Sequence, residues 1–214
     1  MEPEDCLRAG TLLRGGKYRI VKTLGQGGFG ITYKAKMKLE AQGAIGKLVV
    51  ESDVAIKEFF IKSECERNKK SNSVTVSSIK KAGIIKDYHE KFIKEANNLS
   101  KFNHDNIVKV IDIFEENSTA YFVMEYIDGE SLDSIVEKRG AMSELQAKEV
   151  IGQLAKAVDY IHRNKFVHYD IKPANVMLSS TNKIKLIDFG LSKHYGKDGK
   201  QTTLGVTQGV SEGF

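Results

Sequence analysis

The sequence is poor in cysteine, in long apolar runs and in excess charge of either sign. Its two cysteines, Cys6 and Cys65, stand far apart, so they do not form the spacing of a metal site and favour a reducing compartment. No apolar run approaches the roughly 18 residues that a membrane span needs. The acidic start, MEPEDCLRAG, lacks the apolar core of a secretory signal. These absences predict a cytoplasmic protein without a membrane segment.

The charge balance argues against nucleic-acid binding. The 214 residues carry 33 Lys and Arg against 28 Asp and Glu, a net charge of +5. Lysines alternate with acidic residues along most of the chain, whereas a nucleic-acid binder concentrates its basic residues on one face or arm. The composition, 41% hydrophobic and 29% charged, suits one large domain or two small lobes. We find no internal repeat.

The first half of the chain alternates apolar and polar residues, which is typical of strands. Tyr18, Ile20 and Leu24 are expected on one face of a strand, and residues 31–36 form the next strand after a glycine-rich turn. A further strand is expected over 48–60. The segment 61–87 is rich in Lys, Ser and Asn, which predicts a surface insertion. This insertion is expected to hold a short strand at Val74 and Val76.

Helical spacing appears first at Phe92, Ala96 and Leu99 and dominates the second half. Residues 106–116 and 120–126 are expected to be two more strands. After them, Ser143 with Gln146 three residues later forms a capping box at the start of a helix. The apolar stripe of this helix comprises Ala147, Val150, Ile151, Leu154, Val158 and Ile161. The chain therefore divides into a strand-rich and a helix-rich lobe.

The glycine-rich turn GQGGFG, residues 25–30, matches the pattern G-x-G-x-x-G, which is weak evidence on its own. A dinucleotide site would need a helix after the glycines, but residues 31–33 alternate like a strand. A P-loop would need Gly-Lys followed by Ser or Thr, which is absent. A flexible hairpin turn and a flap whose backbone amides cover phosphates both stay open at this point.

Two charged residues could serve such a flap. In VAIK, Ala55 and Lys57 share one face of a strand, so a small residue leaves room for a flat ring beside a cation. Glu95 stands at the edge of the apolar stripe of its helix, where a carboxylate needs a partner, and Lys57 is the candidate. An exposed lysine and a solvated glutamate are the ordinary alternatives for either residue alone.

The loop FVHYDIKPANVML places Asp170, Lys172 and Asn175 between two apolar runs. The aspartate could accept a proton from a hydroxyl, the lysine could neutralise a phosphoryl group, and the asparagine offers a neutral oxygen. Further on, IKLIDFG ends a strand at Asp188. Magnesium prefers oxygen ligands, usually one or two carboxylates completed by phosphates and water.

These five motifs, in this order, resemble the protein kinase family. The resemblance runs from about Lys17 to the last residue. It implies an α+β fold of two lobes: an antiparallel sheet with one helix in the N-lobe, and a mainly helical C-lobe that is incomplete. The boundaries implied are 1–124 for the N-lobe, 125–130 for the hinge and 131–214 for the C-lobe. The flap and the insertion look most like bacterial kinases of the eukaryotic type.

The resemblance assigns a role to each matching residue. ATP and Mg²⁺ are the implied cofactors. Catalytic roles fall to Asp170 as base, to Lys172 at the transferred phosphate, and to Lys57, which holds the α- and β-phosphates and pairs with Glu95. The implied magnesium ligands are Asn175 and Asp188. The residues implied to cover the phosphates or surround the adenine are Leu24, Gly25, Gly27, Gly30, Thr32, Ala55, Met124, Met177 and, through the hinge backbone, Glu125 to Ile127.

The resemblance also implies a packed spine of Leu99, Val110, His168 and Phe189 between the lobes, so His168 is expected to pack rather than to catalyse. Tyr169 departs from the family, because an arginine that binds the activation-segment phosphate often stands there. Tyrosine cannot pair ionically with phosphate. We therefore expect little dependence on phosphorylation of that segment.

Two further departures concern length. The insertion 61–87 is longer than usual and is expected to be a surface loop, or alternatively a docking element. The sequence stops just before the position of the family's Ala-Pro-Glu, with Ser211 aligned to the residue that contacts the catalytic Asp and Lys. We therefore expect a fragment or truncated chain, because the helices that bury the underside of the catalytic loop would be missing.

The sequence thus predicts a protein kinase that acts on Ser or Thr of protein substrates, since Lys172 favours this class over tyrosine kinases. Activity of the truncated chain alone is not expected. A nucleotide-binding pseudokinase or regulatory module is the alternative, although none of Lys57, Asp170 and Asp188 is lost. A small-molecule kinase is a further alternative, against which the D-F-G motif and the flap argue. The oligomeric state is not predicted.

Overall fold

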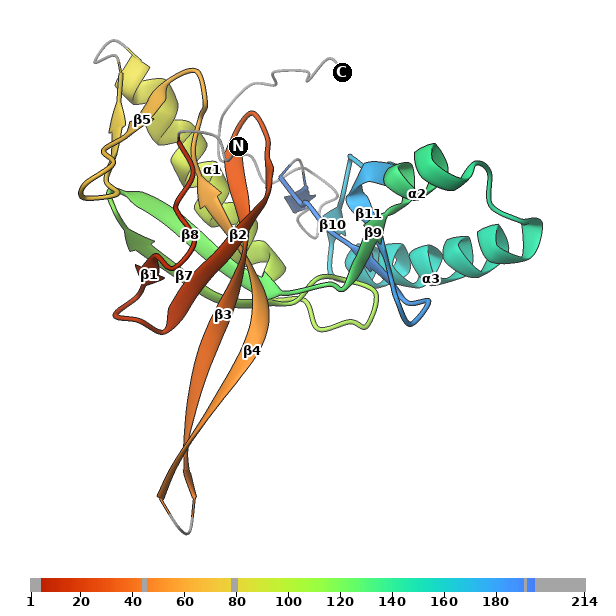
Figure 1. The fold of residues 1–214 in the computed structure, drawn as a ribbon. Helices are drawn as coiled ribbons and strands as arrows, with labels where there is room; N and C mark the ends of the chain where they lie inside the picture. Colours follow the sequence, from red (N-terminus) through yellow and green to blue (C-terminus); the bar gives the residue numbers. More distant parts are fainter. Residues whose placement is uncertain (1–4, 44–45, 78–80, 191, 195–214) are drawn as a thin grey trace.

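The protein folds into two lobes joined by one short connection (Figure 1). The computed structural model describes residues 5–43, 46–77, 81–190 and 192–194. The first lobe is built on a six-stranded antiparallel sheet in the order β1-β2-β3-β4-β8-β7. Its strands are β1 (Leu12–Leu13), β2 (Tyr18–Gln26), β3 (Gly30–Gly43), β4 (Gly46–Phe59), β7 (Val110–Glu116) and β8 (Thr119–Glu125).

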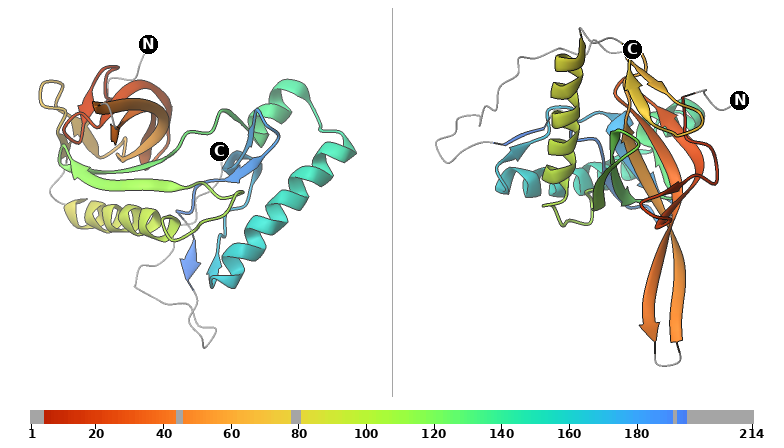
Figure 2. Two further views of the ribbon diagram at one scale, coloured as in Figure 1. Left: turned by 90° about the horizontal axis from the view of Figure 1, so that it is seen from below. Right: turned by 90° about the vertical axis from the view of Figure 1, so that its left-hand side faces the viewer.

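Helix α1 (Ala82–Leu99) covers one face of this sheet (Figure 2). The ring of Phe92 packs 5.6 Å from Phe59 of β4 and 5.1 Å from Phe122 of β8. The helix begins at Ala82, before the residues from which helical spacing was predicted. Ile85 is buried one heptad before Phe92, so the apolar stripe extends into the segment that looked like an insertion. The predicted range 61–87 was therefore too long.

The opposite face of the sheet is covered by two segments that the sequence did not place there. The first is the stretch before β1, in which Cys6 and Leu7 are buried. The second is a hairpin of β5 (Cys65–Arg67) and β6 (Val74–Val76), which confirms the predicted short strand. Both β5 and β6 contribute buried side chains, including Cys65. The insertion is thus a packed layer rather than a simple surface loop.

The strand pattern of β2 was predicted with one error. Tyr18 and Ile20 are buried as expected, but Leu24 is 43% exposed. Two register shifts between β2 and β3, at Ile20/Lys22 and at Thr23/Gly25, interrupt the alternation. A bulge inserts an extra residue, so the side chains beyond it change face.

The second lobe combines two helices with short strands. Its elements are β9 (Gly129–Ser131), α2 (Leu132–Arg139), α3 (Glu144–Arg163), β10 (Phe166–Val167), the 3₁₀ turn η2 (Pro173–Asn175), β11 (Val176–Ser179), β12 (Ile184–Leu186) and β13 (Lys193–His194). The capping box of Ser143 and Gln146 is present at the start of α3. Val150 and Ile161 of the predicted apolar stripe are buried, whereas Ile151 is 62% exposed.

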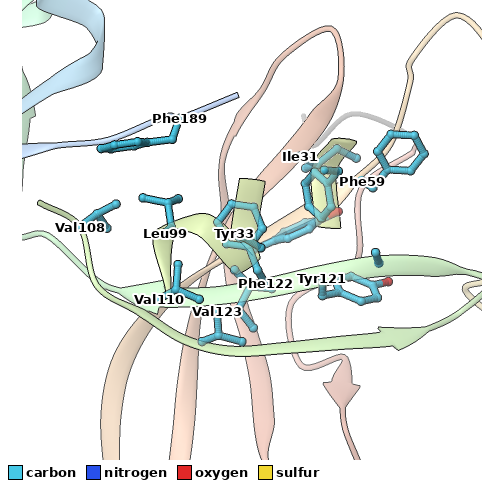
Figure 3. Packing of buried hydrophobic residues seen from close by; sticks show 14 of the residues in the cluster. Ile31, Tyr33, Phe59, Leu99, Val108, Val110, Tyr121, Phe122, Val123 and Phe189 are labelled. Atoms are coloured by element: carbon cyan, nitrogen blue, oxygen red, sulfur yellow. The ribbon is translucent and has the colours of Figure 1, made fainter. Parts of the chain in front are cut away.

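The two lobes share one apolar core. In Figure 3, Leu99 of α1 lies between Val110 of β7 and Phe189 of the second lobe. The ring of His168 meets Phe189 edge-on at 4.5 Å, and both are about 1% exposed. The four residues of the predicted spine therefore all lie in the interior.

Beyond the body of the sheet, β3 and β4 continue as a two-stranded ribbon (Figures 1 and 2). Strand β2 pairs with β3 only as far as Met37, and β8 pairs with β4 only from Val54 onward. Residues 39–43 of β3 pair with residues 46–50 of β4 and, among the described residues, with no other strand, and residues 51–53 of β4 pair only with β3. We call residues 39–43 and 46–53 the ribbon.

Candidate active site

Three of the predicted charged residues converge where the sheet, helix α1 and the second lobe meet. Lys57 Nζ lies 3.2 Å from Glu95 Oε1 and 3.6 Å from Asp188 Oδ1. Alternation along β4 turns Lys57 toward α1, and the apolar stripe of α1 carries Glu95 to the same place. The sequence-based pairing of Lys57 with Glu95 is present in the structure.

The ammonium of Lys57 is stabilised by the carboxylates of Glu95 and Asp188, while burial raises the pKa of Glu95. Burial alone would lower the pKa of Lys57, but the carboxylates of Glu95 and Asp188 outweigh it and raise the pKa above its ordinary value. Burial would raise the pKa of Asp188, but the charge of Lys57 and the amide of Gly190 hold it below its ordinary value. Lys57 is thus a cation and Asp188 an anion at neutral pH.

Asp170, Lys172 and Asn175 form a second cluster on the loop that follows β10. Asn175 Nδ2 donates to the backbone oxygen of Asp170 at 2.8 Å and to its carboxylate Oδ2 at 2.9 Å. Lys172 Nζ lies 3.1 Å from the same Oδ2. Among the described residues, Oδ1 of Asp170 has no hydrogen-bond donor. One carboxylate oxygen is held and the other is available to a substrate.

The two clusters are joined through the backbone and through His168. The amide of Ile187, next to Asp188, donates to the carbonyl of Asn175 at 2.9 Å. His168 Nδ1 accepts the amide of Asp170 at 3.3 Å, which leaves Nε2 to donate to the Ile187 carbonyl at 3.4 Å. Burial lowers the pKa of His168, so the ring stays neutral and positions the loop. This agrees with its predicted packing role.

The glycines of the turn between β2 and β3 differ in their surroundings: Gly25 faces open space, whereas Gly30 lies against the backbone of β4. A Cβ on Gly25 would meet nothing within 4 Å, and one on Gly27 only the Gly30 carbonyl at 3.9 Å. A Cβ on Gly30 would lie 2.8 Å from the Glu58 carbonyl oxygen, which is too close for any real side chain. Glycine is therefore required sterically at Gly30, where the flap crosses β4.

The predicted adenine contacts come together around the sheet's inner strands. Thr32 is paired directly with Lys57, and Ala55 with Met124, so these four side chains lie on one face. Leu24 is exposed near the flap. In the second lobe, Met177 lies on β11, which pairs with β9 just beyond the connection that holds Glu125 and Ile127.

The sequence did not reveal how the connection is fixed. Lys185 Nζ of β12 binds Glu125 Oε1 at 2.7 Å, and the amide of Lys109 donates to the same oxygen at 2.8 Å. Asn106 Nδ2 also donates to the Ile184 carbonyl at 3.0 Å. The only sequence signal for the role of Asn106 is its place in the polar segment NHDN, residues 103–106, just before an apolar run. The family resemblance implies a role for the hinge backbone of Glu125 and none for its side chain.

Tyr169 projects outward beside the catalytic loop and is 52% exposed. The ammonium of Lys193 lies 5.5 Å from the centre of its ring, within the range of a cation–π contact. The backbone of Tyr169 has φ +66°, in the left-handed region. The predicted contact of Ser211 and the rest of the segment 195–214 lie outside the described residues.

Comparison with known proteins decides the family. A model of the protein kinase domain matches residues 61–210, which is more than half of the chain. The chain belongs to the protein kinase family. The solved structure titled PpkA-294 apo form has the same fold, with a TM-score of 0.77 and 26% identity over 87% of this chain and 62% of that chain. The predicted two-lobed α+β kinase fold is confirmed.

The named relatives of this kinase domain are serine/threonine-protein kinases. A probable KIN1 homolog of Enterocytozoon bieneusi is 34% identical over 183 residues, which cover 86% of this chain and 26% of that protein. The kinase PknB of Mycobacterium tuberculosis is 38% identical over 129 residues, or 58% of this chain and 21% of PknB. The chain thus spans about a quarter of the length of these relatives. No helix among the described residues is long and apolar enough to cross a membrane.

Proposed function

We propose that this kinase domain catalyses transfer of the γ-phosphoryl group of ATP, with Mg²⁺, to Ser or Thr hydroxyls of protein substrates in the cytoplasm. The observation that carries the proposal is the linked pair of clusters, Lys57–Glu95–Asp188 and Asp170–Lys172–Asn175. The names of the relatives support the choice of Ser and Thr, as does Lys172.

The donor set suits Mg²⁺ and a nucleotide. The Nδ2 of Asn175 is used twice within the protein, so its Oδ1 is left as a neutral oxygen, while Asp188 supplies an anionic carboxylate. A magnesium site of this kind needs only one or two protein carboxylates, because phosphates and water complete the shell. When bound, Mg²⁺ neutralises the charge of the phosphates. Lys57, paired with Glu95, supplies a second positive charge for them.

The loop that carries Asp170, Lys172 and Asn175 would supply the general base. Oδ1 of Asp170 would orient the substrate hydroxyl and accept its proton as the new oxygen–phosphorus bond forms and the bond between the γ-phosphorus and the ADP oxygen breaks. Asn175 and Lys172 hold Oδ2, so the carboxylate cannot turn away. Lys172 is 52% exposed at its side chain, and its ammonium can follow the phosphoryl group as charge develops there.

The test compares the chain with its Asp170→Asn variant, using γ-labelled Mg·ATP and a generic basic protein as acceptor. We expect labelling to fall at least about a thousandfold in the variant, while the affinity for nucleotide, measured by fluorescence titration, changes less than about threefold. Labelling that survives in the variant would contradict the proposal. Nucleotide binding without labelling by either protein would contradict catalysis by this chain.

A further inference from the structure

The ribbon has an unpaired edge along β4. Strands β3 and β4 each have 14 residues, and their outer parts pair only with each other. Strand β8, which flanks β4 in the body of the sheet, begins its pairing at Val54. Among the described residues, none pairs with the outer side of β4 from Gly46 to Asp53. An open strand edge of this length is a template for another strand.

The backbone groups that face this edge can be identified. The amide of Lys38 donates to Lys17, on the side of β3 that faces away from β4. Lys38 is paired directly with Glu51. In an antiparallel pair, opposite residues either bond to each other or both point away, so Glu51 turns its N–H and C=O to the outer edge of β4. Val49, two residues along, does the same.

The two faces of the ribbon differ. Leu39 is paired directly with Val50, and alternation places Leu48 on the same face. These three side chains are 46–59% exposed, so one face is apolar and in contact with water. The other face carries Glu51, whose carboxylate lies 3.2 Å from Arg19. Isolated two-stranded hairpins are marginally stable in water, and a third strand would stabilise this one.

The sequence of the edge is complementary to itself. If two copies of residues 47–51, KLVVE, run antiparallel about Val49, the register places Lys47 opposite Glu51 of the other copy at both ends. Leu48 then faces Val50 of the other copy on the apolar side, and Val49 meets Val49. Opposite charges and matching apolar residues in directly opposed positions are what stabilise a strand pair. Glu51 remains 37% exposed at its side chain despite Arg19, so it can take part.

We propose that the free edge of β4 pairs antiparallel with the same edge of a second copy of this chain, centred on Val49, so that two ribbons form one four-stranded sheet. Val49 and the two Lys47–Glu51 positions would exchange about six backbone hydrogen bonds. The contact is far smaller than the ~1,200 Å² of a stable interface, so the dimer forms only at high protein concentration.

The first test uses sedimentation of the whole chain over a range of concentrations up to several hundred micromolar. We expect a concentration-dependent dimer. Val49→Pro removes an outward N–H without touching the bonds to β3, a position where proline is tolerated, and should weaken the dimer at least about tenfold. Val49→Thr keeps the amide and the strand preference and should dimerise like the wild type. Equal melting temperatures of the two variants would show that both are folded.

The second test identifies the partner as another copy. Glu51→Lys alone would oppose lysines at both ends of the pair, and Lys47→Glu alone would oppose glutamates, so each variant should be monomeric. An equimolar mixture restores opposite charges at every position and should form a heterodimer. A wild-type monomer at all concentrations, a Val49→Pro variant that still dimerises, or a mixture that stays monomeric would each overturn the proposal. If the wild-type chain is monomeric at all concentrations, a strand of another protein becomes the candidate partner for this edge.

Discussion

Arg67 of the insertion and Glu58 of β4 form a buried ion pair, with 2.6 Å between Nη2 and Oε2 and neither side chain more than 2% exposed. Tyr33 and Tyr121 donate their hydroxyls to the two oxygens of Glu58 at 2.7 and 2.6 Å. Arg67 also donates to the backbone oxygens of Asp5 and Asn72. The network is fully satisfied, and it ties the insertion and the N-terminal stretch to the sheet.

Loss of one partner of this pair is expected to be costly. Arg67→Met leaves an uncompensated carboxylate in the interior and should lower the free energy of unfolding by about 3–5 kcal/mol, measured by urea denaturation. The double variant Glu58→Gln/Arg67→Met removes both charges and should recover part of that loss. Lys148→Met, in the exposed pair with Glu144, is the control and should change stability little. A loss no larger for Arg67→Met than for Lys148→Met would contradict the buried-pair argument.

The flap offers two glycines for comparison. A Cβ at Gly30 would clash with the backbone of Glu58, whereas a Cβ at Gly28 would meet nothing within 4 Å. Gly30→Ala should therefore cost about 1–3 kcal/mol and weaken nucleotide binding, because the flap must move away from β4. Gly28→Ala should leave stability within about 0.5 kcal/mol. Thermal melting with and without Mg·ATP measures both effects, and equal behaviour of the two variants would refute this account.

His168 should make stability depend on pH. Burial lowers its pKa in the folded protein, while the unfolded chain binds a proton below about pH 6.5. The unfolded state therefore takes up more protons in that range, so this part of the stability is present above pH 6.5 and is lost as pH falls through the folded-state pKa. His168→Phe keeps a ring against Phe189 and should show a smaller drop in unfolding free energy between pH 7.5 and 5.5. His162→Gln, on the exposed side of α3, is the control. If His168→Phe loses as much unfolding free energy between pH 7.5 and 5.5 as the wild type does, the prediction is wrong.

Tyr169 leads to a prediction about regulation. Its exposed ring contacts Lys193 and has no charge to bind a phosphate. We therefore expect phosphatase treatment to reduce phosphate transfer less than about twofold. Tyr169→Arg should introduce a dependence on phosphorylation, because arginine can pair with phosphate. Activity that disappears after phosphatase treatment of the wild-type protein would contradict this view of Tyr169.

Short-range patterns predicted the elements of the site well, because each motif is a local sequence whose geometry follows from its strand or turn. Alternation placed Lys57 on the correct face, and the capping box of Ser143 located the start of α3. What the sequence did not reveal depends on partners distant in the chain. Ile151 fits the helical stripe, yet no element among the described residues covers it. Leu24 is exposed because the register shifts between β2 and β3 change the direction of its side chain, and the residue composition does not predict such shifts. The pairing of Arg67 with Glu58 is equally invisible, because a lysine- and serine-rich context makes an arginine look like surface.

The cover that the N-terminal stretch places over the sheet also has a consequence for biosynthesis. The amide of Leu7 donates to Tyr33, the carbonyl of Asp5 accepts from Arg67, and the amide of Arg14 donates to Glu116, which is 102 residues further along the chain. At ribosomal rates of about 5–20 residues per second, the segment waits roughly 5–20 s before its last partner has been made. Leu13 can pair with Tyr18 and Leu7 can bond to Tyr33 much earlier, so the contact with Glu116 is the last of this group to form.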